Sequence, residues 1–304
     1  MAPYYFPILF WTPSAVEDAN RGDFSLVCRK WGVSIFDLYS LVAEKHPIRL
    51  PVELMQIFLA QVNLEILVDA DDYEKACRKL NVLRAILYSQ GISPTLAPFA
   101  TNYSLNSYAG INARSSGSSV DRLHEGLRHG ITITEAKIEG WPNELSLMCL
   151  RGDLEHLTNN LTCDAFVEAA SAVPIWQSIE DKYPAVRNIC SALAKAPLMP
   201  DLSSSILHIW QALESLFRIE SEITYRTSIL LAELCAPIVP RASTYAIAKK
   251  SYGDRSKIAH GSNLSVDTVQ WMRAWGLLRI TCQAILQREA LPSADDLLNE
   301  LLMR

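Results

Sequence analysis

An arginine and a histidine near the C-terminal end of the chain have the chemistry needed to cleave a phosphodiester. Arg255 and His260 are separated by four residues in the segment Tyr252-Gly-Asp-Arg-Ser-Lys-Ile-Ala-His-Gly261. An imidazole ionises near neutral pH, so it can take the proton from an RNA 2′-hydroxyl or give one to the leaving oxygen. A guanidinium can meet two phosphoryl oxygens with parallel hydrogen bonds as charge builds in the transition state. Such cleavage needs no metal, and it would leave a 2′,3′-cyclic phosphate and a 5′-hydroxyl.

The spacing of this pair says little when it is taken alone. An Arg-x-x-x-x-His sequence occurs often by chance, and an isolated histidine more often has a structural role than a catalytic one. In a helix, five positions of about 100° each would place the two side chains roughly 140° apart. They would not stack, although both could border one groove. The surrounding charge and the elements that position the pair therefore decide how it is interpreted.

The charge around the pair differs from that of the whole chain. The sequence of 304 residues has a formal net charge of -5, which excludes a protein that coats nucleic acid by bulk electrostatics. Between Arg241 and Arg279, however, seven basic residues stand against two acidic ones. A solvated helical face is the commoner explanation of such a cluster. We take Lys249, Lys250 and Lys257 from this stretch as candidates for RNA binding.

The C-terminal third has the apolar periodicity of a helical bundle. A long helix is expected over 204–218, where apolar residues recur on one stripe: Ile206, Trp210, Leu213 and Phe217. Further helices are expected over 223–235, 241–250, 267–287 and 295–303. Ser293 and Asp296 have the spacing of a capping box at the start of the last helix.

The first two hundred residues mix helical and strand signals. Apolar residues recur at helical spacing over 24–44 and 72–88, and further short helices are expected over 164–172, 175–181 and 185–194. The segment 64–68 is compatible with a strand, and two more strands are expected over 131–138 and 145–151. The stretch 102–119 is rich in Ser, Asn and Gly, which predicts an exposed loop.

These patterns predict a mixed chain that is mainly α overall. An α+β N-terminal domain of residues 1–199 should be followed by an all-α helical bundle of residues 200–304. Pro197 and Pro200 mark the boundary, although the helices expected just before it could belong to either side.

The composition restricts the cellular compartment in which the protein is expected and the cofactors it is expected to bind. Seven cysteines are scattered without a Cys-x-x-Cys pair or an adjoining histidine cluster, so we expect free thiols in a reducing compartment and no metal site. No Gly-rich phosphate loop is present, and no cofactor is expected. No apolar run reaches the roughly 18 residues of a membrane span, and the start lacks the basic region of a signal peptide. We expect a cytoplasmic protein without a membrane partner.

Two other pairs of residues are weaker candidates for a chemical role. Asp69 and Asp71 follow a short apolar run with a spacing that could bind a divalent cation, but carboxylates at a helix N-terminus are the simpler interpretation. His124 and His129 lie five positions apart, which is a poor spacing for two metal ligands on one helical face. We interpret both as surface histidines.

The residues around Arg255 and His260 resemble the Apea-like branch of the HEPN family. The resemblance runs from Leu207-His-Ile-Trp-Gln-Ala-Leu-Glu-Ser-Leu216, through Thr227-Ser-Ile-Leu-Leu-Ala232, to Tyr252-Gly-Asp-Arg-Ser-Lys-Ile-Ala-His-Gly261. It covers about a third of the chain. Its distinctive feature is an Ala-Leu-Glu helix combined with a Tyr-x-x-Arg-Ser-x-x-x-His-Gly stretch.

The resemblance implies a fold, an activity and roles for named residues. It implies a helical bundle that forms a homodimer, with two Arg-His pairs at a shared cleft, and a metal-independent ribonuclease that serves as a toxin or an antiphage abortive-infection effector. By position, Arg255 and His260 match the catalytic pair, and Glu214 matches the polar residue that faces it. Ser256 and Tyr252 would order the loop or touch phosphate, although packing is the commoner role for such a tyrosine.

The sequence departs from the family pattern at one position, and an alternative function is also open. Some HEPN toxins carry a tyrosine two residues after the motif histidine, where a partner enzyme modifies and silences them; here Gly261 and Ser262 follow His260. We expect RNA, with tRNA as one candidate, as the substrate, and a phage-derived trigger or an antitoxin as regulator. The alternative is a catalytically inactive HEPN dimer that acts as a binding or scaffolding module.

Overall fold

The computed structural model describes residues 1–29, 32–43, 56–57, 59–117, 120–140, 157–261 and 265–303. The chain divides into two compact units. The first unit contains residues 1–80, 95–145 and 158–170, and the second contains residues 81–94, 146–157 and 171–304. The described strands all belong to the first unit, and the second is helical. The predicted fold class, an α+β part followed by an all-α part and mainly α overall, is confirmed.

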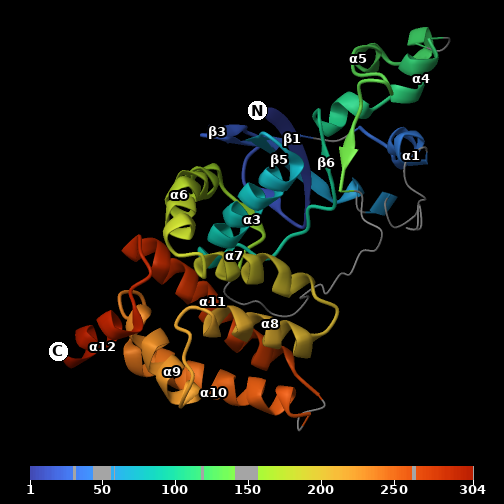
Figure 1. The fold of residues 1–304 in the computed structure, drawn as a ribbon. Coiled ribbons are helices and arrows are strands. Elements are labelled where there is room, and N and C mark those ends of the chain that lie inside the picture. The colour runs from blue at the N-terminus through green and yellow to red at the C-terminus, as the bar shows by residue number, and fades with distance from the viewer. Residues whose placement is uncertain are drawn as a thin grey trace. The chain divides into compact units, whose positions relative to one another are not determined.

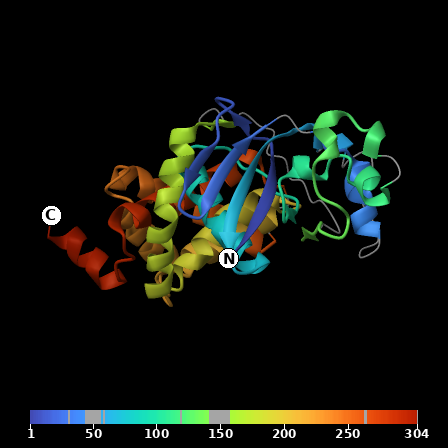
Figure 2. The same cartoon turned by 90° about the horizontal axis from the view of Figure 1, so that it is seen from above.

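An antiparallel sheet organises the first unit (Figure 1). Its strand order is β3-β4-β5-β1-β6-β7. The strands are β1 (Ala2–Leu9), β3 (Ala19–Arg21), β4 (Phe24–Cys28), β5 (Val62–Ala70), β6 (Ala100–Thr101) and β7 (Ile138–Glu139). The two longest, β1 and β5, pair along their whole length and lie side by side in Figure 2. A second small sheet pairs β2 (Thr12–Pro13) with β8 (Asn160–Leu161) in parallel.

Most helices of the first unit lie between the strands of the sheet along the chain. They are α1 (Ile35–Ala43), η1 (Leu105–Tyr108), α4 (Ile111–Ser116), η2 (Val120–Arg122), α5 (Glu125–Arg128) and the first turns of α3 (Tyr73–Ser89) and α6 (Cys163–Lys182). The division between the units therefore falls inside α3 and α6. Lys79 of α3 holds its helix to the strands by donating to Asp23 at 2.6 Å and to the backbone oxygen of Asp69 at 2.7 Å.

Three predictions for the N-terminal part are wrong or need correction. The helix expected over 24–44 is strand β4 followed by α1, because Phe24, Leu26 and Cys28 are buried with a period of two and pair with β5. The strand expected over 131–138 reduces to β7, which pairs with β6, and the strand expected over 145–151 lies outside the described part of the chain.

The third correction concerns the expected exposed loop at 102–119. This stretch contains η1 and α4, and Leu105, Tyr108 and Ile111 are fully buried. Arg114 explains how so polar a segment is ordered, because its guanidinium donates to four backbone oxygens, those of Ser107, Ala109, Leu127 and Ile131. The half-buried guanidinium of Arg114 thus ties these backbone segments together, and its partial desolvation lowers the pKa of Arg114.

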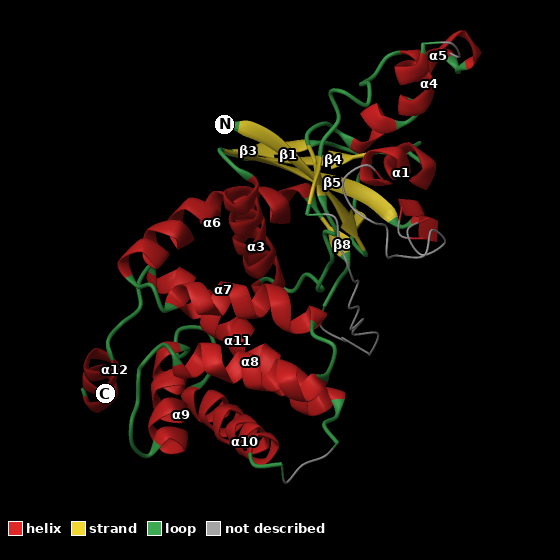
Figure 3. Cartoon of the chain, turned by 45° about the vertical axis from the view of Figure 1, so that its right-hand side comes forward, coloured by secondary structure: helices red, strands yellow, loops and turns green. Residues whose placement is uncertain are grey.

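The second unit is a bundle in which α8 has a central place (Figure 3). Its helices are α7 (Val186–Lys195), η3 (Ala196–Leu198), α8 (Leu202–Glu214), α9 (Ile223–Leu234), α10 (Arg241–Ala259), α11 (Thr268–Arg288) and α12 (Ala294–Leu302), with the later turns of α3 and α6. Helix α8 contacts α7, α10 and α11. Four fully buried tryptophans fill the core: Trp176, Trp210, Trp271 and Trp275.

The helical predictions for this unit are largely confirmed. The Asp267 and Ser293 side chains cap α11 and α12 in capping boxes. Helix α6 continues through Pro174, where two helices were expected, because apolar residues stay in helical register on both sides of the proline. Helix α10 extends nine residues beyond the expected end at Lys250. The unit also includes α7, which lies before the expected boundary at residue 200 and packs on α8 and α11.

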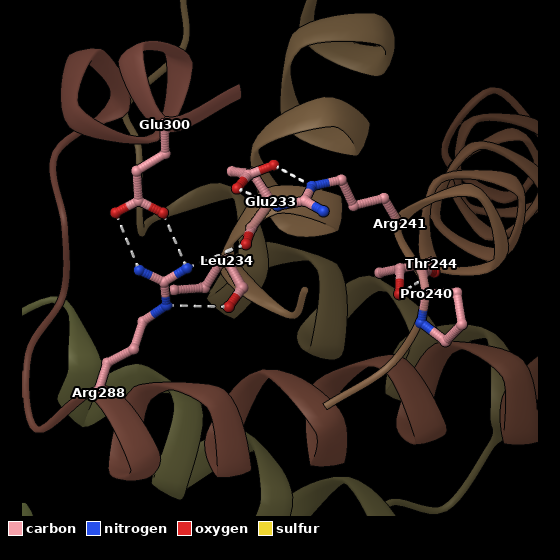
Figure 4. A network of polar contacts seen from close by, with 7 residues as sticks. All are labelled: Glu233, Leu234, Pro240, Arg241, Thr244, Arg288 and Glu300. Carbon is pink, nitrogen blue, oxygen red and sulfur yellow. Dashed lines mark hydrogen bonds and ion pairs between the residues drawn. The ribbon is translucent and has the colours of Figure 1, made fainter. Parts of the chain in front are cut away.

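Two arginines tie the ends of four helices together (Figure 4). Arg241 at the start of α10 donates to both carboxylate oxygens of Glu233, at 2.5 and 2.8 Å, and Glu233 is 1% exposed. Arg288 of α11 donates to the backbone oxygens of Glu233 and Leu234, and it also binds Glu300 of α12 at 3.1 Å. These bonds satisfy carbonyls at the end of α9 that have no partner within the helix.

No helix of the described residues combines the length and the apolarity that a bilayer crossing requires.

A buried glutamate in the first unit makes its stability depend on pH. Glu65 of β5 is fully buried, and it accepts hydrogen bonds from the Leu105 N–H at 2.5 Å and the Ser104 hydroxyl at 2.8 Å. Burial raises the pKa of Glu65 from 4.5 to about 7, against the opposing effect of these bonds. The folded state therefore binds this proton more tightly than the unfolded state, and stability rises as pH falls from about 7 towards 4.5.

We predict that Glu65→Gln removes this pH dependence. The amide reproduces the protonated acid, because its oxygen can accept from Leu105 while its nitrogen donates to Ser104. Urea unfolding at pH 5 and pH 7.5 should show that the wild-type chain loses up to about 3 kcal/mol of stability at the higher pH and the variant much less. The exposed substitution Glu125→Gln should retain the wild-type dependence. If stability changed by the same amount between pH 5 and pH 7.5 in the wild type and in Glu65→Gln, the prediction would be contradicted.

Candidate functional site

Helix α10 carries both residues of the predicted catalytic pair. The helix runs through the motif to Ala259, and His260 is its C-cap residue. The expected pause in helical structure is absent up to that point, because Ser251, Tyr252 and Asp254 face the interior and hold the segment in the bundle. The helix ends where Gly261 adopts a left-handed conformation with φ of 68°, which a glycine reaches without strain.

Arg255 is held by a carboxylate and an aromatic ring. Its Nη2 donates to Glu214 Oε2 at 3.2 Å, and its guanidinium lies 5.5 Å from the centre of the Tyr252 ring. Both partners of this ion pair are about a quarter exposed. Neither Arg255 Nε nor Glu214 Oε1 has a hydrogen-bond partner among the described residues. The guanidinium is therefore oriented by one contact while most of its donor capacity is unused.

Tyr252 is part of the packing between α8 and α10. Its ring meets Trp210 of α8 edge-on at a centroid distance of 5.0 Å, and the residue is 9% exposed. Burial raises the pKa of Tyr252, and the negative charge of Glu214 adds to the effect. Trp210 Nε1 also donates to the Ser251 hydroxyl at 3.0 Å. The phenol thus stays neutral, and the Tyr252 ring supports the Arg255 guanidinium of the ion pair with Glu214.

His260 lies in a different environment at the exposed end of α10. Its backbone N–H bonds to the oxygen of Ser256 at 3.1 Å, while no contact of its imidazole is recorded within the described ranges. Ser256 is half-buried one turn earlier on the helix, and Ser262 lies outside the described part. An imidazole that is open to solvent can exchange protons freely, which a general base or acid requires.

The structure brings Arg255, Glu214 and Tyr252 together but leaves His260 apart from them. Five helical positions turn the two motif side chains roughly 140° away from each other and about 7.5 Å along the axis. No hydrogen bond joins Arg255 to His260 in the described residues. Within one chain the two groups make no direct hydrogen bond, and they would meet one phosphate only across a groove that both border.

The basic residues between Arg241 and Arg279 fall into two classes. The four arginines are all engaged inside the unit: Arg241 with Glu233, Arg255 with Glu214, Arg273 with Asp254, and Arg279 with the backbone oxygen of Tyr88. The lysines named as RNA-binding candidates are all exposed. Lys249 lies over the Tyr245 ring at 5.9 Å, whereas Lys250 and Lys257 are on the side of α10 that faces α11. The arginines thus support the fold, and the lysines supply the exposed charge.

The sequence analysis did not single out His208, which lines a polar cavity between α7 and α8. The cavity has a volume of about 170 Å³, and Asn188, Gln211 and Ser215 also line it. His208 Nε2 is buried without a partner among the described residues, and burial lowers the pKa of this imidazole. A histidine inside an apolar helical stripe has no sequence signal that separates it from ordinary core packing.

The two competing constellations are structural. Asp71 pairs with the Lys75 ammonium at 2.9 Å beside the start of α3, whereas Asp69 lies within strand β5 and not at the helix N-terminus. Asp72 accepts from the Lys75 N–H at 2.7 Å at the same helix start. His124 and His129 are both exposed. Across the described ranges, no group of three His, Cys, Asp or Glu side chains is arranged to hold a metal ion.

Comparisons with known proteins identify no relative of this chain. No protein-family model matches it, and neither a curated protein nor a solved structure matches. The assignment of a function therefore depends on the residues and their geometry.

A double-mutant cycle tests the Arg255–Glu214 contact. We predict a coupling of about 0.5–1 kcal/mol between Arg255→Ala and Glu214→Ala in urea unfolding, because the pair makes one hydrogen bond and is partly exposed. The matched cycle with Lys250→Ala in place of Arg255→Ala should give no coupling to Glu214. A coupling near zero for the first cycle would mean that Glu214 does not hold the guanidinium.

Proposed function

We propose that the helical unit is a metal-independent endoribonuclease of the HEPN type. The observation that carries the proposal is the arrangement on α10, where a solvent-open imidazole at the helix end follows an arginine that a carboxylate holds in place. Both groups required for cleavage through the 2′-hydroxyl are present, and neither is locked into a complete internal network. The Apea-like pattern around them supports the same interpretation.

In the proposed reaction, the 2′-oxygen of the substrate attacks the adjacent phosphorus and the bond to the 5′-oxygen breaks. His260 takes the proton of the 2′-hydroxyl or returns one to the leaving oxygen. Arg255 stabilises the charge that builds on the phosphoryl oxygens, where its unused donors are of value. Glu214 positions the guanidinium through its single hydrogen bond. The products are a 2′,3′-cyclic phosphate and a 5′-hydroxyl.

We infer that the working site is assembled from two copies of the chain. Within one copy, Arg255 and His260 leave α10 in directions roughly 140° apart. In a two-fold dimer a residue of one copy contacts a different residue of the other, and the same contact occurs a second time with the copies exchanged, so Arg255 of each copy can lie beside His260 of the other. The homodimer is therefore part of the proposed mechanism.

The biological role we propose is that of a toxin or an antiphage abortive-infection effector in the cytoplasm. The six described cysteines are free thiols, which fits a reducing compartment. The first unit would sense a phage-derived trigger or bind an antitoxin and restrain the nuclease. RNA, with tRNA as a candidate, would be the substrate.

A catalytically inactive binding module is the second candidate, and one observation favours it. Glu214 already compensates the charge of Arg255, and the imidazole of His260 has no orienting partner among the described residues. In that case the helical unit would dimerise without cutting RNA, and Arg255 would serve packing alone.

Cleavage in the presence of EDTA separates the two candidates. We predict that the purified full-length chain degrades single-stranded RNA or tRNA in EDTA and leaves cyclic phosphate ends, which mass spectrometry of the fragments detects. His260→Ala and Arg255→Ala should each lower the rate at least about a hundredfold and leave the oligomeric state unchanged. His129→Ala, which alters an exposed histidine of the other unit, should cut like the wild type. Cleavage that survives both motif substitutions would come from a contaminant and would refute the proposal.

A further inference from the structure

An open pocket lies between α10 and the first turn of α11. Its volume is about 590 Å³, and its walls include Lys250, Asp254, Lys257, Asp267, Gln270 and Arg273. This volume lies within the range of small-molecule sites, and the polar walls contain no apolar patch that would favour a hydrophobic ligand. The pocket was not apparent from the sequence, because it depends on how the consecutive helices α10 and α11 pack against each other.

Both carboxylates of the pocket are committed to internal bonds. Asp254 accepts from Arg273 Nη1 at 2.5 Å and from Gln270 Nε2 at 3.1 Å, so each of its oxygens is used. Asp267 accepts from the Gln270 N–H at 2.7 Å and caps α11. Arg273 compensates the charge of Asp254, the N-terminal end of α11 stabilises that of Asp267, and these bonds hold both carboxylates in one arrangement.

The exposed charge of the pocket is positive. Lys250 and Lys257 are exposed and seven positions apart on α10, so they lie on the same side of the helix about two turns from each other. Lys250, Lys257 and Arg273 stand against Asp254 and Asp267, and Arg273 is paired with Asp254, so the lining carries one positive charge in excess in a chain whose formal net charge is -5. Such a local reversal of charge favours an anionic ligand.

The position of Lys257 relates the pocket to the candidate cleavage site. Lys257 precedes His260 by three positions, and side chains at this spacing are neighbours on a helix surface. The pocket therefore adjoins the solvent-open imidazole rather than the Arg255–Glu214 pair, which is on the α8 side of α10.

We propose that this pocket binds a backbone phosphate of single-stranded RNA, from a nucleotide next to the scissile bond. Lys250 and Lys257 neutralise the phosphate. The hydrogen-bonded side chains of Asp254, Gln270 and Arg273 position the nucleotide in the pocket. The open side lets the strand continue in both directions, which favours a polymer over a free nucleotide. The assignment of this nucleotide to a position near the cut rests on the proposed ribonuclease function, but binding can be measured without cleavage.

The test uses the full-length chain with His260→Ala and a fluorescent 2′-O-methyl oligonucleotide, which lacks the attacking hydroxyl. Fluorescence anisotropy at several KCl concentrations gives the affinity and its salt dependence. Adding Lys250→Ala and Lys257→Ala should weaken binding about tenfold or more and should reduce the slope of log affinity against log salt by about 0.7, the contribution of one neutralised phosphate on a single strand. The control pair Lys182→Ala and Lys195→Ala, two exposed lysines elsewhere in the helical unit, should change neither quantity.

A photocrosslinking arm locates the bound strand. An oligonucleotide carrying 4-thiouridine should crosslink to peptides that contain Lys250, Lys257 or Arg273, and the double lysine variant should lose this crosslink. An unchanged salt slope, or a crosslink that survives the substitutions, would overturn the proposal. So would AMP or inorganic phosphate binding that depends on the two lysines while oligonucleotide binding does not. Lysine-dependent binding by a wild-type chain that cuts no RNA would support the pocket and refute the nuclease, so the two proposals fail separately.

Discussion

The packing of α10 against α8 decides what the helical unit can do. The Glu214–Arg255 contact, the edge-on contact of Tyr252 with Trp210 and the Trp210–Ser251 hydrogen bond hold one side of α10 against its neighbour. With that side fixed, the helical repeat places Lys250 and Lys257 on the side towards α11 and His260 at the free end. The same interactions that stabilise the helix therefore orient every group that could meet an RNA strand.

In this arrangement the candidate functional groups lie on different sides of one helix, α10. The arginine is held on an inner side, the imidazole is in solvent, and the cationic pocket adjoins the imidazole. A phosphate that is to meet both motif residues must reach two sides of α10 at once, which a second copy of the chain makes geometrically reasonable. Dimerisation in this account creates the active site, so a change in the first unit that altered assembly would also control cleavage.

Much of this organisation could be predicted from local sequence patterns, and the failures have physical causes. The amphipathic stripe containing Ile206 and Trp210 and the Ser293–Asp296 cap predicted helices correctly, since these signals act within a few residues. The order of 102–119 depends on Arg114, whose partners extend to Ile131, and strand β4 depends on pairing with β5. The Glu214–Arg255 contact could be expected only from a resemblance, because it joins residues far apart in the chain. The pocket that Arg273 lines could not be expected, because it depends on how α10 and α11 pack.

Mixing two inactive variants tests the central claim most directly. Arg255→Ala and His260→Ala chains would be combined under conditions that exchange subunits, and RNA cleavage in EDTA would be measured against each variant alone. If one phosphate meets Arg255 of one copy and His260 of the other, a mixed dimer contains one intact site of two, and random exchange of equal amounts makes about half of the dimers mixed, so about a quarter of the wild-type activity should return. Mixed dimers that form but remain as inactive as their parents would contradict a site assembled across the two copies.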